Sequence, residues 1–277
     1  MGDLMKSNIS VSLKIIDAPK LKLIKKIFIK FIPNRPKVKE VESEGIISRD
    51  ITYKKRDEKI NWKKISDIIK KDSNYVLCDK KIRIPAIFGI QRFSSNKLYR
   101  RFCQNAALHV IENMEVNKKE LKVTVYDPRG AYLELVEKLL CHLDQLQIVS
   151  NNIDYYEAVR EKLIEKYKVN ILLNDNILSI SDSNIVIAPD KIRVNLNLSE
   201  DAIVFTAEPS SIDLNCNVID KYKVNMPIKY KILVPDYIED EYFLSYLYSE
   251  YRLYDLGLLV PVYCIVGNQV KSISTLF

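Results

Sequence analysis

Glycine is scarce in this chain of 277 residues, with 6 in all, whereas average usage would give roughly 19. Neither the phosphate-binding pattern G-x-x-x-x-G-K-[ST] nor the nucleophile elbow G-x-S-x-G occurs. Histidine is rarer still, and His109 and His142 share no metal-ligand spacing with each other or with a cysteine. The sequence therefore argues against P-loop nucleotidases, elbow-type hydrolases and zinc enzymes. It predicts no metal site and identifies no catalytic residue.

Paired cysteines and long apolar runs are also missing. None of the five cysteines lies in a C-x-x-C pair, which predicts free thiols in a reducing cytoplasm. The beginning of the chain mixes apolar residues with lysines and predicts no signal peptide. The uncharged run at 256–270 is too short for a membrane span and is interrupted by Pro261 and Gly267. We expect a cytoplasmic protein without a membrane span.

Charge is distributed unevenly along the chain. Residues 1–120 hold 28 Lys and Arg against 14 Asp and Glu, a net charge of +14, and residues 121–277 hold 15 against 22, a net charge of −7. The sum is the net charge of +7 of the whole chain. The basic part could meet nucleic acid, but its charges are spread over many segments and stand beside acidic residues. We therefore expect it to pack on acidic surface of the same chain or of a second copy, and nucleic-acid binding is the less favoured alternative.

The stretch 121–209 alternates short β-branched segments with amphipathic segments of helical period. Strands joined by helical crossovers pair in parallel, and right-handed crossovers produce a doubly wound sheet. The sequence thus predicts an α/β fold whose neighbouring parallel strands include 123–126, 148–149, 171–173, 185–187 and 203–205.

In element order this stretch resembles the Rossmann-type dinucleotide-binding domains. That resemblance implies a G-x-G-x-x-G turn after the first strand and an acidic ribose ligand after the second. Here the turn is Asp127-Pro128-Arg129-Gly130, and the second strand ends in Ser150-Asn151-Asn152. Both anchors of the cofactor are missing, so the favoured hypothesis is a non-catalytic binding or regulatory protein that has no cofactor. The alternative is an NAD(P)-dependent oxidoreductase with an atypical cofactor turn.

Open α/β sheets bind ligands at the carboxyl ends of their strands. The polar and small residues at those positions define a candidate ligand crevice, although Asp and Asn are also ordinary turn residues there. The candidate residues are Asp127, Arg129, Gly130, Ser150, Asn151, Asp175, Ala188 and Asp190.

The remaining segments predict a basic α+β region at 1–117, followed by the Rossmann-like domain at 118–277. Expected elements of the first region are strands at 9–15, 45–53, 75–78 and 82–84, and helices at 62–71 and from 95 or 96 to 114. A Tyr-rich helix is predicted at 236–256, with Asp236 as its N-cap. Because tyrosine suits half-wet positions, this helix is a candidate surface for a protein partner or a second copy.

Overall fold

The computed structural model describes residues 8–17, 35–55, 60–115, 120–208, 215–252, 261–266, 269–273 and 276. Its contacts divide the chain into two compact units. The first unit combines Met1–Ser95 with Met226–Leu256, and the second combines Asn96–Asn225 with Gly257–Phe277. The division of the chain into 1–117 and 118–277 as folding domains stays a prediction.

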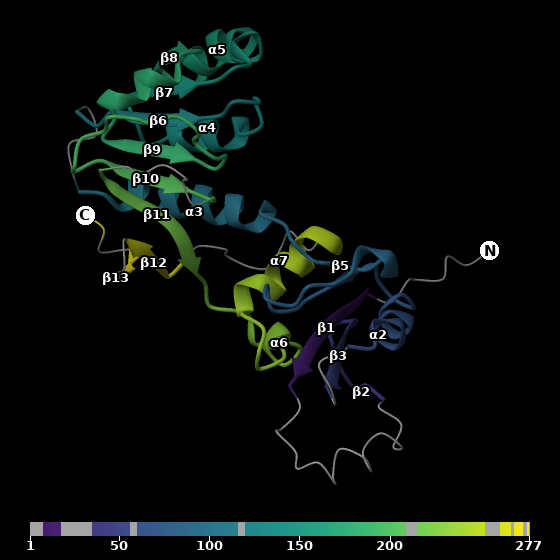
Figure 1. Ribbon diagram of the computed structural model, residues 1–277. Coiled ribbons are helices and arrows are strands. Elements are labelled where there is room, and N and C mark those ends of the chain that lie inside the picture. The colour runs from purple at the N-terminus through teal and green to yellow at the C-terminus, as the bar shows by residue number, and fades with distance from the viewer. Residues whose placement is uncertain are drawn as a thin grey trace. The chain divides into compact units, whose positions relative to one another are not determined.

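The second unit is built on an eight-stranded sheet, visible in Figure 1 as the ladder from β8 to β13. Its order is β13-β12-β11-β10-β9-β6-β7-β8, with parallel pairing from β11 to β8 and antiparallel pairing of β12 and β13. The five predicted strands are parallel neighbours, so the predicted doubly wound α/β sheet is confirmed. The strands are β6 (Val123–Tyr126), β7 (Gln145–Val149), β8 (Asn170–Asn174), β9 (Ile185–Ala188), β10 (Ile203–Thr206), β11 (Asn217–Lys223), β12 (Tyr263–Val266) and β13 (Gln269–Ser272).

Helices connect and cover the parallel strands. The crossover from β6 to β7 is α4 (Leu133–Leu140), and α5 (Ile153–Tyr167) joins β7 to β8. The connection from β8 to β9 is a short 3-10 segment, Ile177–Asp182. A long helix, α3 (Lys97–Asn113), packs on β9, β10 and β11. Every residue of β9 and β10 is buried, as expected for central parallel strands that are covered on both faces.

The first unit is a smaller α+β structure. Strand β1 (Asn8–Ile16) pairs in parallel with β3 (Ile46–Lys54), and β2 (Lys37–Ser43) pairs antiparallel with β3. Helix α2 (Trp62–Ile69) follows, and the Asn61 side chain caps it by accepting a hydrogen bond from the Lys64 N–H at 3.1 Å. Short strands β4 (Tyr75–Val76) and β5 (Gln91–Arg92) pair in parallel, with the 3-10 turn Ala86–Phe88 between them. Helices α6 (Ile228–Lys231) and α7 (Asp240–Glu250) complete the unit.

Several local predictions need correction. Residues 82–84 form no strand and are irregular, and the next strand is β5 at Gln91–Arg92. Helix α7 begins at Asp240 instead of Asp236, since Glu239 is the capping residue and is extended. Gly257, which follows the predicted helix in the sequence, and the lysine-rich segment at 20–32 lie outside the described residues. All five cysteines are free, but Cys141 is exposed.

The tyrosines of the C-terminal helix region bond within the first unit. Tyr237 donates to the Asp50 carboxylate, and Tyr242 donates to the Phe93 carbonyl at 2.7 Å. Tyr246 is buried against the Phe93 ring at 5.0 Å between centroids. A partner surface on this helix stays a prediction. Among the described residues, no helix has the length and apolar character that crossing a membrane requires.

Candidate functional site

The order in which successive parallel strands are added to the sheet of the second unit changes side between β6 and β9. In chain order the six strands lie as third, second, first, fourth, fifth and sixth, so β9 adjoins β6 on the side opposite β7. In open sheets with this strand order, ligands usually bind at the carboxyl ends of the two strands that flank such a switch point. Asp127, Arg129 and Gly130 follow β6, and Asp190 follows β9.

The Asp127 carboxylate is fully buried at the end of β6. One oxygen accepts from the backbone N–H groups of Arg129 at 3.3 Å and Ala131 at 2.9 Å. The other accepts from the N–H of Tyr132 at 2.7 Å and from the Tyr156 hydroxyl at 2.5 Å. Burial, together with the hydrogen bond to Asp127, raises the pKa of Tyr156, so this phenol stays protonated and keeps its role as a donor.

These backbone donors lie in the turn before α4, where a sheet of this order binds phosphate. In this chain an internal carboxylate occupies them. A second anion placed there would lose these hydrogen bonds and meet a buried negative charge. The turn after β6 thus differs from the usual phosphate-binding turn because the Asp127 carboxylate already accepts from its backbone N–H groups.

Gly130 shapes the same turn. Its φ of +73° lies in the left-handed region, which favours glycine. A Cβ atom there would also lie 2.9 Å from a ring carbon of Tyr155 and 3.1 Å from the Asn152 side-chain nitrogen. Asn152 in turn donates to the Arg129 carbonyl at 3.3 Å. The turn after β6 is thus packed directly against the start of α5.

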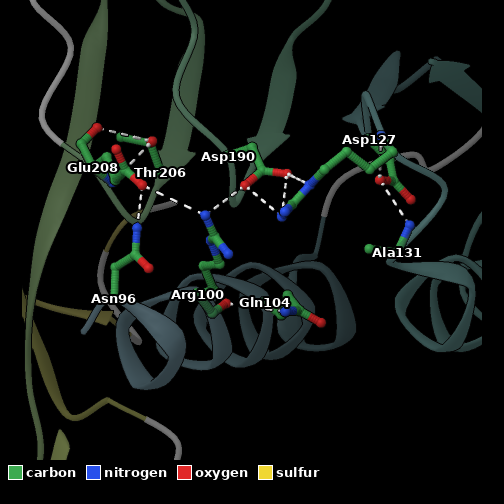
Figure 2. Close-up of polar contacts among 9 residues, drawn as sticks. Asn96, Arg100, Gln104, Asp127, Ala131, Asp190, Thr206 and Glu208 are labelled. Atoms are coloured by element: carbon green, nitrogen blue, oxygen red, sulfur yellow. Dashed lines mark hydrogen bonds and ion pairs between the residues drawn. The ribbon is translucent and has the colours of Figure 1, made fainter. Parts of the chain in front are cut away.

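Asp190 is the centre of a charged network that bridges the loops after β6 and β9. Its carboxylate accepts from Arg129 Nε at 3.2 Å and from Nη2 at 2.9 and 3.0 Å, and from Arg100 Nη2 at 2.9 Å (Figure 2). The Asp190 charge raises the pKa of Arg129. The Arg129 side chain is 56% exposed, whereas that of Asp190 is 11% exposed. Arg129 therefore combines a fixed guanidinium with an open face toward solvent.

Tyr132 adds a buried hydroxyl to this network. It lies beside Arg129 and Asp190 but makes no hydrogen bond of good geometry to either. Burial, and then the Asp190 charge, raises its pKa. A protonated phenol beside two guanidinium groups can donate a hydrogen bond to an anionic or carbonyl oxygen of a ligand.

The network continues to residues that the sequence did not single out as a site. Arg100 Nη2 lies 3.6 Å from Glu208 Oε1, and Asn96 donates to the same oxygen (Figure 2). Thr206, at the end of β10, donates its hydroxyl to the Glu208 carbonyl at 3.1 Å. Glu208 follows β10 and so shares the position rule that selected Asp127 and Asp190. Arg100 lies in the basic part of the chain, and nothing in its local sequence distinguishes it from the other cations there.

The other predicted site residues lie apart from this cluster or serve the backbone. Ser150 is buried, and its hydroxyl accepts from the Asn152 N–H at 3.0 Å, as a turn residue does. Asn151 and Asp175 are exposed, and Ala188 is buried inside β9. Of the eight candidate residues, the structure brings Asp127, Arg129, Gly130 and Asp190 together after β6 and β9, and their role as a ligand site stays a prediction. Within the residues that the structure describes, no cluster of His, Cys, Asp or Glu has the form of a metal site.

No family model matches the chain, and no curated protein sequence matches it. Solved structures do. A dipicolinate synthase component from Bacillus halodurans is 10% identical, with 91% of this chain and 99% of that chain covered and a TM-score of 0.39. L-tryptophan dehydrogenase from Nostoc punctiforme is 14% identical, with coverages of 89% and 75% and a TM-score of 0.34. A shikimate dehydrogenase in complex with NADP+ is 14% identical, with coverages of 72% and 78% and a TM-score of 0.29.

The second unit is a Rossmann-like domain. At these identities the likeness concerns the fold alone. Two predictions from the sequence are nevertheless corrected, since structures named as dehydrogenases are matched and one of them holds NADP+. The favoured hypothesis of a non-catalytic protein was wrong, and so was the expectation of no cofactor. Both followed from the missing glycine turn and the missing acidic residue after the second strand, and two local features were too narrow a basis for them.

Proposed function

We propose that the chain is an NAD(P)-dependent oxidoreductase with an atypical cofactor turn. The observation that carries the proposal is the strand order of the second unit, in which the switch point between β6 and β9 matches the usual dinucleotide-binding arrangement. Strand order indicates only the class of ligand, and the side chains near the switch point determine how that ligand is held.

The usual pyrophosphate contact does not fit this turn. The Asp127 carboxylate takes the N–H groups of Arg129, Ala131 and Tyr132. A dinucleotide in the crevice therefore has to be held by side chains. Arg129 supplies a guanidinium that is more than half exposed at this edge, and guanidinium pairs well with phosphate oxygens. No carboxylate follows β7 until Asp154, so the ribose contact of NAD is also missing, and we favour the phosphorylated dinucleotide.

Calorimetric titration of the full chain with NAD+, NADH, NADP+ and NADPH tests this proposal. We expect saturable binding of an NADP form, and about tenfold weaker binding in Arg129→Gln, as for the loss of one charged hydrogen bond. Arg160→Gln is the matched control, because Arg160 lies on α5 of the same unit and pairs only with Glu157 among the ion pairs of the described residues. Absence of heat with all four dinucleotides at millimolar concentration would refute the proposal.

We also propose three further properties that the sequence predicts. They are a cytoplasmic location, contact with a partner or a second copy through the Tyr-rich helix region, and no functional binding of nucleic acid. Analytical ultracentrifugation across protein concentrations measures self-association. Fluorescence anisotropy with labelled single- and double-stranded oligonucleotides measures nucleic-acid binding, and saturation below about 1 μM that weakens steeply with salt would contradict the third expectation.

A further inference from the structure

The first unit contains a pocket of about 510 Å³ that has no place in the proposed dinucleotide crevice. Its lining comes from the segments that follow two parallel strands and from the segment that leads into helix α7. Residues Cys78 to Lys81 follow β4, residues Arg92 to Ser94 lie at the end of β5, and residues 237–239 and Tyr242 lie at the start of α7. Pockets of this size accommodate small organic ligands, and the carboxyl ends of parallel strands are their usual place in α/β structures.

Three cationic side chains surround the pocket: Lys80, Lys81 and Arg92. All three are exposed, and they take part in none of the ion pairs found among the described residues. Two carboxylates, Asp79 and Glu239, also line it. One oxygen of Asp79 already accepts from the Lys81 backbone N–H at 2.7 Å. The balance around the pocket is positive, and its cations have charge available for a ligand.

The wall of the pocket is aromatic and held in place from behind. The Tyr242 hydroxyl donates to the Phe93 carbonyl at 2.7 Å, and the two rings lie 6.0 Å apart. Tyr237 is bound through its hydroxyl to Asp50. Both tyrosines line the pocket, and their hydroxyl groups are already bonded. A planar apolar group suits such a wall.

The floor of the pocket includes the buried thiol of Cys78. Burial raises the pKa of Cys78 to about 11, although the nearby Arg92 charge acts in the opposite direction. The thiol is therefore neutral at physiological pH, and it adds no negative charge that would repel an anion.

We propose that this pocket binds a small organic anion, in which a carboxylate or phosphate meets Lys80, Lys81 and Arg92 and a planar apolar part lies on Tyr237, Tyr242 and Phe93. The inference rests on the first unit alone. Failure of every dinucleotide to bind would leave it standing, and failure of every anion to bind would leave the dinucleotide proposal standing.

Calorimetric titrations of the full chain with four probes test it: phthalate, benzoate, inorganic phosphate and benzyl alcohol. Phthalate and benzoate combine a ring with carboxylate, phosphate carries charge without a ring, and benzyl alcohol carries a ring without charge. We expect phthalate to bind most tightly and benzyl alcohol not to bind measurably. Binding of phosphate with little binding of benzoate would support the cationic side of the pocket and would overturn the assignment of a planar group to its aromatic wall.

Variants then locate the binding. In the double variant Lys81→Gln/Arg92→Gln we expect phthalate affinity to fall at least about tenfold, as for the loss of hydrogen bonds to a charged group. Lys63→Gln, an exposed lysine on α2 of the same unit, is expected to leave the affinity unchanged. Circular dichroism checks that each variant is folded, which is expected because the replaced side chains are exposed. The proposal is overturned if no anion binds below about 10 mM, if benzyl alcohol binds as well as benzoate, or if the double variant binds phthalate as the wild type does.

Discussion

Replacing Asp127 by asparagine is expected to destabilise the turn after β6 strongly. The carboxylate accepts four hydrogen bonds, three of them from backbone N–H groups and one from Tyr156. Asparagine keeps one acceptor oxygen and replaces the other by an NH2 donor. The Tyr156 hydroxyl can rotate and accept from that donor, but the N–H of Tyr132 is fixed and loses its partner. One orphaned buried donor and the lost charge together cost about 2–4 kcal/mol.

Two measurements check this value. Urea unfolding followed by circular dichroism reports the free energy of unfolding, and amide hydrogen exchange of a peptide spanning 123–140 reports opening of the turn. A loss of about 2–4 kcal/mol corresponds to exchange that is roughly 30-fold to 1,000-fold faster. Asp175→Asn is the matched control, because this exposed carboxyl follows strand β8 of the same sheet, and surface changes of this kind stay within about 0.5 kcal/mol. If Asp127→Asn were as stable as that control, the carboxylate would not be the acceptor that holds the turn.

The variant Asp127→Ala tests whether the Asp127 carboxylate keeps external anions out of the turn after β6. Without the carboxylate, the backbone N–H groups of the turn are open to an external anion, as in phosphate-binding turns. We expect inorganic pyrophosphate to raise the melting temperature of Asp127→Ala more than that of the wild type, in which only side chains can hold it. An equal shift in both proteins would show that phosphate binds elsewhere and that Asp127 does not block the turn.

Three further outcomes are expected. In Gly130→Ala, a left-handed φ is combined with a new Cβ atom 2.9 Å from a ring carbon in α5. Urea unfolding should therefore show a larger loss in the free energy of unfolding than the roughly 1–2 kcal/mol expected for Gly45→Ala, where φ is +70° and the space is open. Equal losses in the two variants would contradict the packing argument. Burial raises the pKa of Tyr156 in the folded state, so its contribution to the free energy of unfolding is complete below the unfolded pKa near 10 and is lost as pH rises above that value. Tyr156→Phe should therefore flatten the alkaline fall in the free energy of unfolding, and a pH profile equal to that of the wild type would contradict this role of Tyr156. Burial raises the pKa of Cys103 to about 12, whereas Cys141 is exposed. Mass spectrometry after iodoacetamide treatment of the native protein should therefore find Cys141 modified first. Modification of Cys103 before Cys141 would show that the helix of Cys103 opens readily.

The sequence by itself determined the α/β class and the parallel core. Strand and helix periodicity are local properties of the chain, and a short β-branched segment between two amphipathic helices has few ways to bury its side chains other than a parallel sheet. Position after a strand also identified Asp127 and Asp190, since the carboxyl ends of parallel strands lie at one edge of the sheet. Short segments such as 82–84 were misassigned because a few alternating residues do not distinguish a strand from a turn.

Only the tertiary structure decided what these residues do. Asp127 and Asp190 have the same local signature, yet one carboxylate is bound to its own turn and the other holds two arginines. Arg100 meets Asp190 across 90 positions of sequence because α3 packs on β9 and β10. Such a pairing depends on the strand order and on which helix covers which strands. Neither is encoded in the periodicity of a segment, because long-range packing fixes both.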